Sequence, residues 1–221
     1  MTGLPVDTTP AKKPGDVRLE GRFGAVEKLD ALRHGADLWH AVKDADQIWT
    51  YLVNGPFADP KSFSAWLDER AALEDPYAYA ILDKNNKAVG IATLLEIRPA
   101  MRVIEVGHIL YSPALQRTPL ATEAQYLLAR YVFETLGYRR YEWKCDSQNA
   151  PSRRAAARFG FTFEGIFRQH MIRKGVNRDT AWFSMLDSEW PQRKAAFEAW
   201  LAPSNFDNDG RQKKSLAAFR Q

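Results

Sequence analysis

The chain has 221 residues, of which 45% are hydrophobic and 26% are charged, a composition that supports one domain with a sizeable core and argues against global disorder. Its formal net charge of +4 favours an anionic ligand but is too weak, without a clustered basic face, to indicate nucleic acid. A single cysteine excludes an internal disulfide framework, and no apolar run approaches the roughly 20 residues of a membrane-spanning helix. We therefore expect a cytoplasmic protein.

The first part of the chain is predicted to hold a strand and two helices. Residues 1–16 are rich in Pro, Thr and Lys and have no apolar signal core, so we expect a flexible arm. A strand is expected at 18–23, continuing toward AVEKL, and helical spacing of apolar residues runs through 36–52. The next helix is expected to have Asp59 as its N-cap and Pro60 at its first position.

Three strands joined by turns are predicted in the middle of the chain, over 77–83, 88–97 and 102–111. The third is an apolar run that contains Gly107, which is compatible with a β-bulge. Simple alternation along this strand places Glu105 and His108 on opposite faces of the sheet.

A long amphipathic helix is predicted over 118–136, with Thr118 as N-cap, Pro119 at its first position and Gly137 as a left-handed C-cap. A strand, a short helix, two more strands and a closing helix follow. The order predicts a mixed α/β sheet of about six to seven strands in a domain spanning 17–202, with a flexible tail over 203–221. The long helix is a crossover, which makes the strands on either side of it parallel.

Four segments share their order and spacing with one known family. VGHILYSPALQRTPLATEA matches a fourth strand followed by a Q/R-x-x-G-x-G/A turn and a long helix, and YRRYEWKCDSQNAPSRRAAARFGF matches a fifth strand, an Asn-x-x-Ser segment and a helix ending in Gly-Phe. EGIFRQHMIRKG and RDTAWFSML match the last two strands. Over residues 15–190 the chain resembles the GCN5-related N-acetyltransferase (GNAT) superfamily, in its RimJ/RimL-like branch. The resemblance implies the GNAT fold, a splayed parallel strand pair and acetyl-CoA as co-substrate.

The start of the long helix is the candidate pyrophosphate site. A helix that begins after a strand offers unpaired backbone N–H groups and the positive end of the helix dipole. On local sequence alone, an ordinary capped turn explains the same residues. Arg117 and Pro119 stand where the family usually has glycine; proline removes an N–H donor, while Arg117 offers a charge-assisted contact to phosphate. The resemblance assigns these residues to acetyl-CoA binding: Ile109, Leu110, Tyr111, Gln116, Arg117, Thr118, Leu120, Ala121, Thr122, Asn149 and Ser152.

Two residues are candidate proton carriers. Glu105 lies near the expected splay, where a buried carboxylate is a suitable general base for an attacking amine; the alternative is a glutamate held in a salt bridge. Glu96 and His108 are weaker competitors. Ser152 matches the serine proposed in RimL-like enzymes to protonate the leaving thiolate, although a serine in a first helical turn is also a normal cap. Asn149 is expected to bond the pantetheine amides, because its side chain both donates and accepts.

The acceptor side is the least defined part of the prediction. Trp39 or Trp49 could line it, and Arg168 and His170, placed on one strand face, could orient the substrate together with Asp179; the alternative is plain surface or sheet pairing. The four histidines lack metal-ligand spacing, so no metal is expected. Cys145 lies near the expected CoA sulfur and is predicted to be a packed strand cysteine rather than a nucleophile.

The function that follows from the resemblance is acetyl transfer to a primary amine by direct attack in a ternary complex. The acceptor is left open between a protein N-terminal α-amine and a small-molecule amine. The rival is a non-catalytic CoA-binding or protein-interaction module that kept the GNAT fold, and the replacement of glycines by Arg117 and Pro119 is what motivates it. Dimers are common in the family, but no feature of this sequence requires a homodimer.

Overall fold

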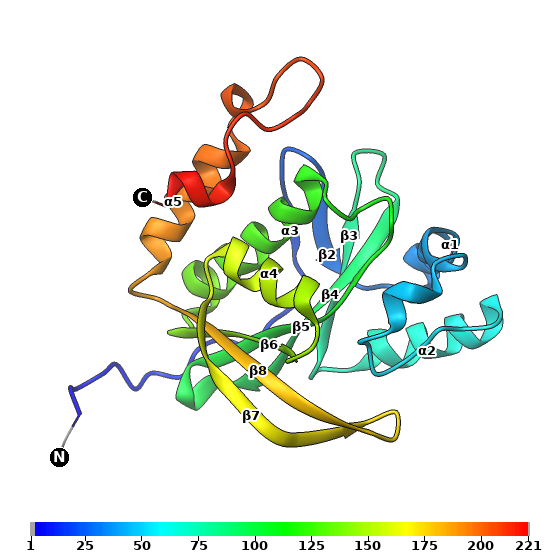
Figure 1. Cartoon of the computed structure of the whole chain (residues 1–221), viewed down its shortest axis with the longest axis horizontal. Coiled ribbons are helices and arrows are strands. Elements are labelled where there is room, and N and C mark those ends of the chain that lie inside the picture. The colour runs from blue at the N-terminus through cyan, green and yellow to red at the C-terminus, as the bar shows by residue number, and fades with distance from the viewer. Residues whose placement is uncertain (1–2, 221) are drawn as a thin grey trace.

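One mixed sheet organises the molecule. The computed structural model describes residues 3–220, in which eight strands lie in the order β1-β2-β3-β4-β5-β6-β8-β7 (Figure 1). Neighbouring strands are antiparallel except for β5 and β6, which are parallel as predicted. The strands are β1 (Arg18–Glu20), β2 (Ala25–Lys28), β3 (Tyr77–Leu82), β4 (Ala88–Arg98), β5 (Val103–Tyr111), β6 (Arg140–Asp146), β7 (Thr162–Arg173) and β8 (Val176–Leu186).

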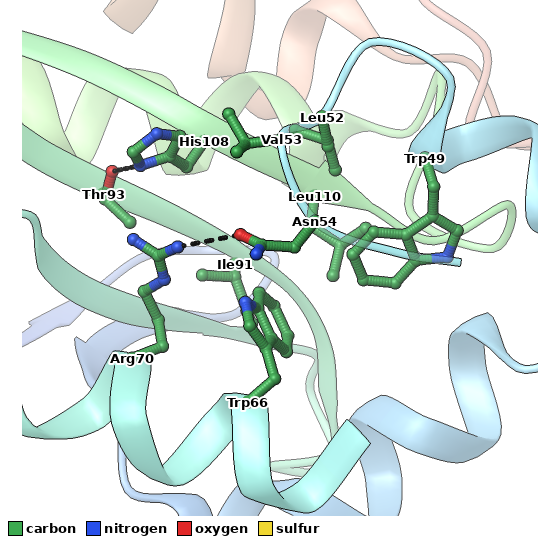
Figure 2. A pocket seen from close by; sticks show the side chains of 10 residues that line it. All are labelled: Trp49, Leu52, Val53, Asn54, Trp66, Arg70, Ile91, Thr93, His108 and Leu110. Carbon is green, nitrogen blue, oxygen red and sulfur yellow. Dashed lines mark hydrogen bonds between the residues drawn. The ribbon is translucent and has the colours of Figure 1, made fainter. Parts of the chain in front are cut away.

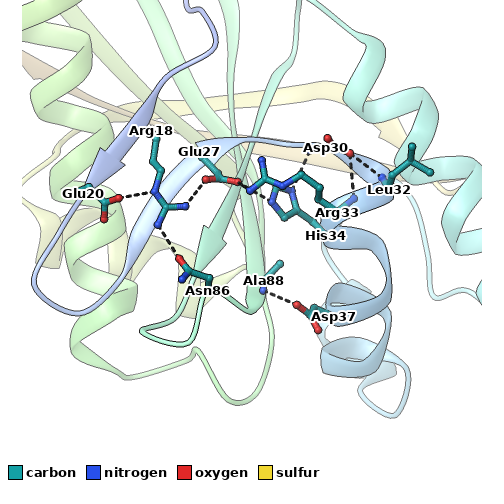
Figure 3. A network of polar contacts seen from close by, with 10 residues as sticks. All are labelled: Arg18, Glu20, Glu27, Asp30, Leu32, Arg33, His34, Asp37, Asn86 and Ala88. Atoms are coloured by element: carbon teal, nitrogen blue, oxygen red, sulfur yellow. Dashed lines mark hydrogen bonds and ion pairs between the residues drawn. The ribbon is translucent and has the colours of Figure 1, made fainter.

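The strand count exceeds the expected six to seven because the first expected strand is a hairpin. The segment RLEGRF turns at Gly21–Gly24, so that β1 and β2 pair with each other, Leu19 opposite Val26. At this end of the sheet the buried carboxylate of Glu27 contacts Arg18 of β1 and both Arg33 and His34 of the first helix (Figure 3). This network ties the hairpin to that helix.

Five α-helices cover the two faces of the sheet: α1 (Ala31–Val42), α2 (Pro60–Ala72), α3 (Pro119–Arg130), α4 (Ala150–Phe159) and α5 (Trp190–Leu201). Residues of α3, α4 and α5 share one hydrophobic core with buried side chains such as Tyr141 of β6. Residues of α1 and α2 pack on the opposite face against β3, β4 and β5. Among the described residues, this second core includes none from β6, β7 or β8; on that face Lys144 of β6 lies 4.1 Å from the ring centroid of Trp182 of β8.

The predicted helix starts are confirmed. Asp59 caps α2 by accepting from Ser62 N at 2.9 Å, and Thr118 caps α3 by accepting from Ala121 N at 3.2 Å. The long helix ends at Gly137 with a φ of 78°, after α3 passes into a π-helical turn over Tyr131–Leu136. The first helix is shorter than expected, because α1 ends at Val42 and only a 3-10 turn at Asp46–Trp49 follows.

Parts of both chain extensions contact the domain. Ala11 N donates to Pro99 O at 3.1 Å, and Leu216 is buried near the end of the chain. Asn205, also buried, donates to Trp200 O at 2.9 Å. The domain boundaries at residues 16 and 202 remain predictions, and their outermost residues, 1–2 and 221, lie outside the described part. Within the described residues, no helix is long and apolar enough to cross a membrane.

Candidate active site

The parallel strands part in the middle of the sheet. β5 pairs with β6 only from Val103, opposite Arg140, to Val106, opposite Trp143. Beyond Val106, β5 stays with β4, while β6 continues along β8 to Asp146. The predicted splayed pair is therefore present, and the gap opens beside Gly107–Tyr111.

A bulge in β5 lies directly at this gap. Thr93 of β4 is opposite Gly107, whereas Ile91 is opposite Leu110, so β5 carries one extra residue. That residue is His108, whose φ of 46° is left-handed; the expected bulge exists, but the left-handed position is not the glycine. The bulge breaks the alternation of side chains, and His108 lies on the face that carries Glu105 and Thr93. The prediction that Glu105 and His108 occupy opposite faces is wrong for this reason.

Glu105 belongs to a buried charge network on this face. Its Oε2 is 2.9 Å from Lys144 Nζ, which is also 3.0 Å from Glu142 Oε2. Glu142 in turn contacts Arg98 at 2.9 Å and Arg140 at 2.7 Å. Burial raises the pKa of Glu105 to about 7, outweighing the opposite effect of Lys144. Glu105 thus has the salt bridge of the alternative interpretation and also a pKa suited to proton transfer at neutral pH.

Gly107 gives the Glu105 carboxylate room beside the bulge. A Cβ at this position would lie 3.4 Å from Glu105 Oε1 and only 2.9 Å from Leu95 Cδ2. A side chain at 107 would therefore crowd the carboxylate against β4. The absence of one keeps Glu105 Oε1 next to the point where β5 leaves β6.

His108 has a defined tautomer in this setting. Thr93 Oγ1 donates its single proton to Gly107 O at 3.0 Å and lies 3.3 Å from His108 Nδ1. Nδ1 must then carry the proton that Thr93 accepts, which leaves Nε2 as an acceptor. Burial lowers the pKa of His108 to about 4, with Arg70 and Arg178 acting in the same direction, so the ring is neutral at pH 7.

On the other face of the gap, Ser152 is a hydrogen-bond acceptor rather than a helix cap. Its Oγ accepts from Trp143 Nε1 at 3.0 Å, and the cap of α4 is Asn149, whose Oδ1 accepts from Ser152 N at 3.1 Å. With the indole donating to Oγ, the Ser152 hydroxyl keeps its own proton to donate, and the neighbouring Cys145 sulfur is one acceptor for it. Asn149 keeps its Nδ2 as a donor for a ligand, while its Oδ1 already accepts one hydrogen bond. Cys145, next to Ser152, is packed as predicted, and burial raises the pKa of its thiol.

The start of α3 keeps part of the expected anion cradle. Gln116 and Arg117 are exposed, and Arg117 adopts the left-handed φ of 62° that a glycine would favour. Gln116 Nε2 donates to Tyr111 O at 3.0 Å, which occupies one backbone group expected to face pantetheine. Leu120, Ala121 and Thr122 are buried in the first turn, where Thr122 Oγ1 accepts from Arg158 at 2.9 Å.

A pocket lies beside the gap on the Glu105 face (Figure 2). It is walled by α2, by the loop after the 3-10 turn, and by β4 and the unpaired part of β5. Its lining residues are Trp49, Leu52, Val53, Asn54, Trp66, Arg70, Ile91, Thr93, His108 and Leu110. Of the two tryptophans considered for the acceptor side, Trp49 lines it; Trp39 instead packs on Phe63 with ring centroids 5.5 Å apart.

Asn54, Trp66 and Arg70 were not predicted as site residues. Phe63, Trp66 and Leu67 share one helical face with Arg70 in the sequence. An arginine on an otherwise apolar helical face is the feature of the sequence that could have indicated a binding residue at this position.

The three residues expected on the last strands lie apart from this pocket. Asp179 accepts from Gln169 N at 2.7 Å and from Asn177 Nδ2 at 2.9 Å, and so holds a bulge in which Gln169 has a φ of 49°. His170 Nδ1 is 3.0 Å from Thr180 Oγ1, and Arg168 is exposed in the bulge. The bulge interrupts the alternation from which Arg168 and His170 were placed on one face.

The β7–β8 hairpin holds the loop that carries Asn54. Lys174 Nζ, at the hairpin turn, donates to Gly55 O at 2.9 Å and to Trp49 O at 3.3 Å. Arg173 donates to Tyr51 O and lies 3.4 Å from Asp146 Oδ2 at the end of β6. The pocket loop is therefore anchored to the far side of the gap. Among residues 3–220, no group of three His, Cys, Asp or Glu side chains is arranged to hold a metal ion.

Comparison with known proteins agrees with this geometry. Residues 28–162 match the family model described as an acetyltransferase (GNAT) domain. The crystal structure of a GCN5-related N-acetyltransferase from Brucella melitensis is 54% identical, with 96% of this chain and 97% of that chain covered and a TM-score of 0.94. A probable acetyltransferase (GNAT family) from Chromobacterium violaceum is 44% identical, with 86% and 96% covered and a TM-score of 0.81.

More distant structures share the fold alone. A ribosomal-protein-S5-alanine acetyltransferase from Vibrio fischeri is 18% identical, with 79% of this chain and 99% of that chain covered and a TM-score of 0.64. No curated protein matches the sequence significantly.

Proposed function

This chain belongs to the GNAT acetyltransferase family, and from that premise we propose that it moves the acetyl group of acetyl-CoA to a primary amine by direct attack in a ternary complex. The observation that carries the proposal is the splay after Val106. Beside this splay, the Glu105 carboxylate, with a pKa of about 7, lies on one face of the sheet and the Ser152 hydroxyl lies on the other.

Acetyl-CoA is proposed to enter along the gap. The phosphates would meet the start of α3, where Arg117, Thr118 and the backbone through Thr122 face an anion with the positive end of the helix dipole. The pantetheine arm would run beside Ile109, Leu110 and Tyr111, which lack a β6 partner. Asn149 would contribute its remaining Nδ2 as a donor to a pantetheine carbonyl.

Glu105 is the proposed general base. The amine nitrogen attacks the thioester carbonyl, and Glu105 takes the proton that the nitrogen must lose, directly or through one water. A pKa of about 7 lets the carboxylate accept a proton near neutral pH and release it afterwards. His108 is a second candidate for this role, because its Nε2 is unprotonated, although its pKa of about 4 makes it the weaker base.

Ser152 is proposed to assist the departure of CoA. When the carbon–sulfur bond breaks, the sulfur leaves as a thiolate and takes a proton from the Ser152 hydroxyl, and the serine oxygen regains a proton from a solvent water molecule. Trp143 Nε1 fixes the serine oxygen as acceptor, so its hydrogen points away from the indole. Cys145, with its pKa raised by burial, is a poor nucleophile and takes no covalent part.

The proposal is tested by a screen of primary amines with acetyl-CoA, in which thiol release is followed and the product is identified by mass spectrometry. N-terminal peptides and small amines are included as acceptors. We expect acetyl-CoA to bind by calorimetry and at least one amine to gain an acetyl group. Binding without turnover on any acceptor would favour the non-catalytic CoA-binding module, and no binding at all would remove the acetyltransferase assignment.

A further inference from the structure

The α2 and loop walls of the pocket carry hydrogen-bond donors that lack an acceptor. Among residues 3–220, Arg70 makes one side-chain hydrogen bond, from Nη2 to the uncharged Asn54 Oδ1 at 3.2 Å, and its guanidinium lies 5.9 Å from the centroid of the Trp66 ring. Trp66 Nε1 is buried and has no hydrogen-bond partner among the described residues. In Figure 2 the Arg70 guanidinium and the Trp66 indole rise side by side from α2, beneath Asn54 and facing β5.

No carboxylate pairs with Arg70. Among residues 3–220, none of the ion pairs within 4.0 Å includes it. Burial lowers the pKa of Arg70 by more than the opposing charge of Glu69 raises it, which means that part of its hydration has been removed without an ion pair to replace it. A partly desolvated, unpaired guanidinium in a pocket is a receptor for a planar anion, since its donors form a fork that matches a carboxylate.

A second unpaired guanidinium lies close to the same pocket. Arg178 of β8 has a buried Nε without a hydrogen-bond partner in the described chain, and burial lowers its pKa as well. The nearby acids are already paired, Asp146 with Arg173 and Glu105 with Lys144. The charges of Arg70, on α2, and Arg178, on β8, both lower the pKa of His108, so two positive charges from different elements lie near the imidazole beside the gap.

We propose, on the basis of the proposed acetyl transfer, that the acceptor is a small primary amine that carries a carboxylate a few bonds from its nitrogen, together with an apolar group. Arg70 and Trp66 would bind the carboxylate, while Asn54 holds the guanidinium in place. Trp49, Leu52 and Leu110 would enclose the apolar group. The amine would then lie toward His108 and Glu105, because the pocket ends on β5.

A free apolar amino acid has this chemistry in full, whereas a peptide whose first residue is Asp or Glu shares only the carboxylate near the amine. The test compares L-phenylalanine with L-phenylalaninamide, in which an uncharged carboxamide replaces the carboxylate, at equal concentrations of the unprotonated amine, because the amide also lowers the pKa of the amine. The peptide arm compares an Asp-Ala-Ala amide with an Asn-Ala-Ala amide. We expect kcat/KM to be higher for the carboxylate member of at least one pair by about ten-fold or more, as a charged hydrogen bond implies.

The variants Arg70→Gln and Lys61→Gln separate a local effect from a general charge effect. Both remove one positive charge from α2, but Lys61 is exposed in the first turn and lies outside the pocket. Arg70→Gln should raise KM for the preferred carboxylate substrate about ten-fold or more and abolish the preference over its amide, whereas Lys61→Gln should change neither. Calorimetry with the preferred compound and no acetyl-CoA gives a readout of binding that does not depend on turnover.

The outcomes distinguish the two proposals. If amines are acetylated but both members of each pair react equally well, the carboxylate inference is overturned and the acetyltransferase proposal stands. The same holds if Arg70→Gln affects the acid and its amide alike. If no amine is acetylated but the carboxylate compound still binds through Arg70, the pocket assignment survives and the proposed acetyl transfer fails.

Discussion

Two charged regions on the same face of the sheet are built in opposite ways. Around Glu105, Lys144 and Glu142, every charge has a partner within 3.0 Å, and Arg98 and Arg140 complete the network. Beside it, Arg70 and Arg178 are half-buried and pair with no acid among residues 3–220. A network in which every charge is paired can hold a proton carrier in position. Unpaired, partly desolvated charges such as Arg70 and Arg178 destabilise the free protein, and a bound ligand of opposite charge can offset that cost.

Of the variants that test this difference between the two regions, Glu105→Gln is expected to have the largest effect on kcat. Loss of the proposed base should lower kcat by about 100-fold or more, the range that general bases contribute. Glu74→Gln is the matched control, because Glu74 is exposed and its only ion pair among residues 3–220 is a surface contact with Lys13 at 3.6 Å. If Glu105→Gln leaves kcat within a few-fold of the wild-type value, Glu105 is only part of the structural network.

The pH dependence sharpens the same point. The folded-state pKa of Glu105, about 7, exceeds its ordinary value of 4.5, so its contribution to stability is fully present below about pH 4.5 and is lost as pH rises through about 7. Catalysis depends on the opposite form, and kcat should rise to a plateau as pH passes about 7. In Glu105→Gln both the activity rise and this part of the stability slope should disappear, which denaturant unfolding at several pH values would check.

Ser152→Ala should have an intermediate effect. A thiolate is a good leaving group, so the loss in kcat should stay below the roughly 100-fold of a full general acid. The variant also leaves Trp143 Nε1 without its acceptor and should lower the free energy of unfolding by about 1 kcal/mol. Cysteine at this position, which restores a proton donor, is the informative partner variant. Equal loss of kcat in Ser152→Ala and Ser152→Cys would contradict a proton-donating role.

Arg117→Gly should give the smallest effects, and they should oppose each other. The left-handed φ of 62° strains an arginine but not a glycine, so the free energy of unfolding should rise by no more than about 1 kcal/mol. The exposed charge is lost at the same time, and the Kd for acetyl-CoA should rise by no more than about five-fold. Denaturant unfolding and calorimetry measure the two effects, and tighter acetyl-CoA binding by the variant would show that Arg117 has no part in the site.

Local signals in the sequence were enough to predict the frame of the site. The caps at Asp59 and Thr118, the C-cap at Gly137 and the crossover between β5 and β6 depend on neighbouring residues, and all are confirmed. Cys145 is buried, as predicted for a packed strand cysteine. These features need no knowledge of contacts between distant segments.

What the sequence did not predict depends on contacts between distant segments. The bulge puts His108 in a left-handed conformation that is uncommon for residues other than glycine, and Thr93 on the neighbouring strand contacts the imidazole there. The link from Glu105 to Lys144 requires the register of the parallel pair. The pocket brings Arg70 together with Asn54 only because α2 and the preceding loop pack over β5.

The most direct test of the two-region account is the pair of kinetic constants for Glu105→Gln and Arg70→Gln, measured with the same carboxylate-bearing amine. Glu105→Gln should lower kcat and leave KM nearly unchanged, whereas Arg70→Gln should raise KM and leave kcat nearly unchanged. If both variants change the same constant, the account is contradicted, because the paired charges around Glu105 and the unpaired Arg70 would then not have separate roles in catalysis and acceptor binding.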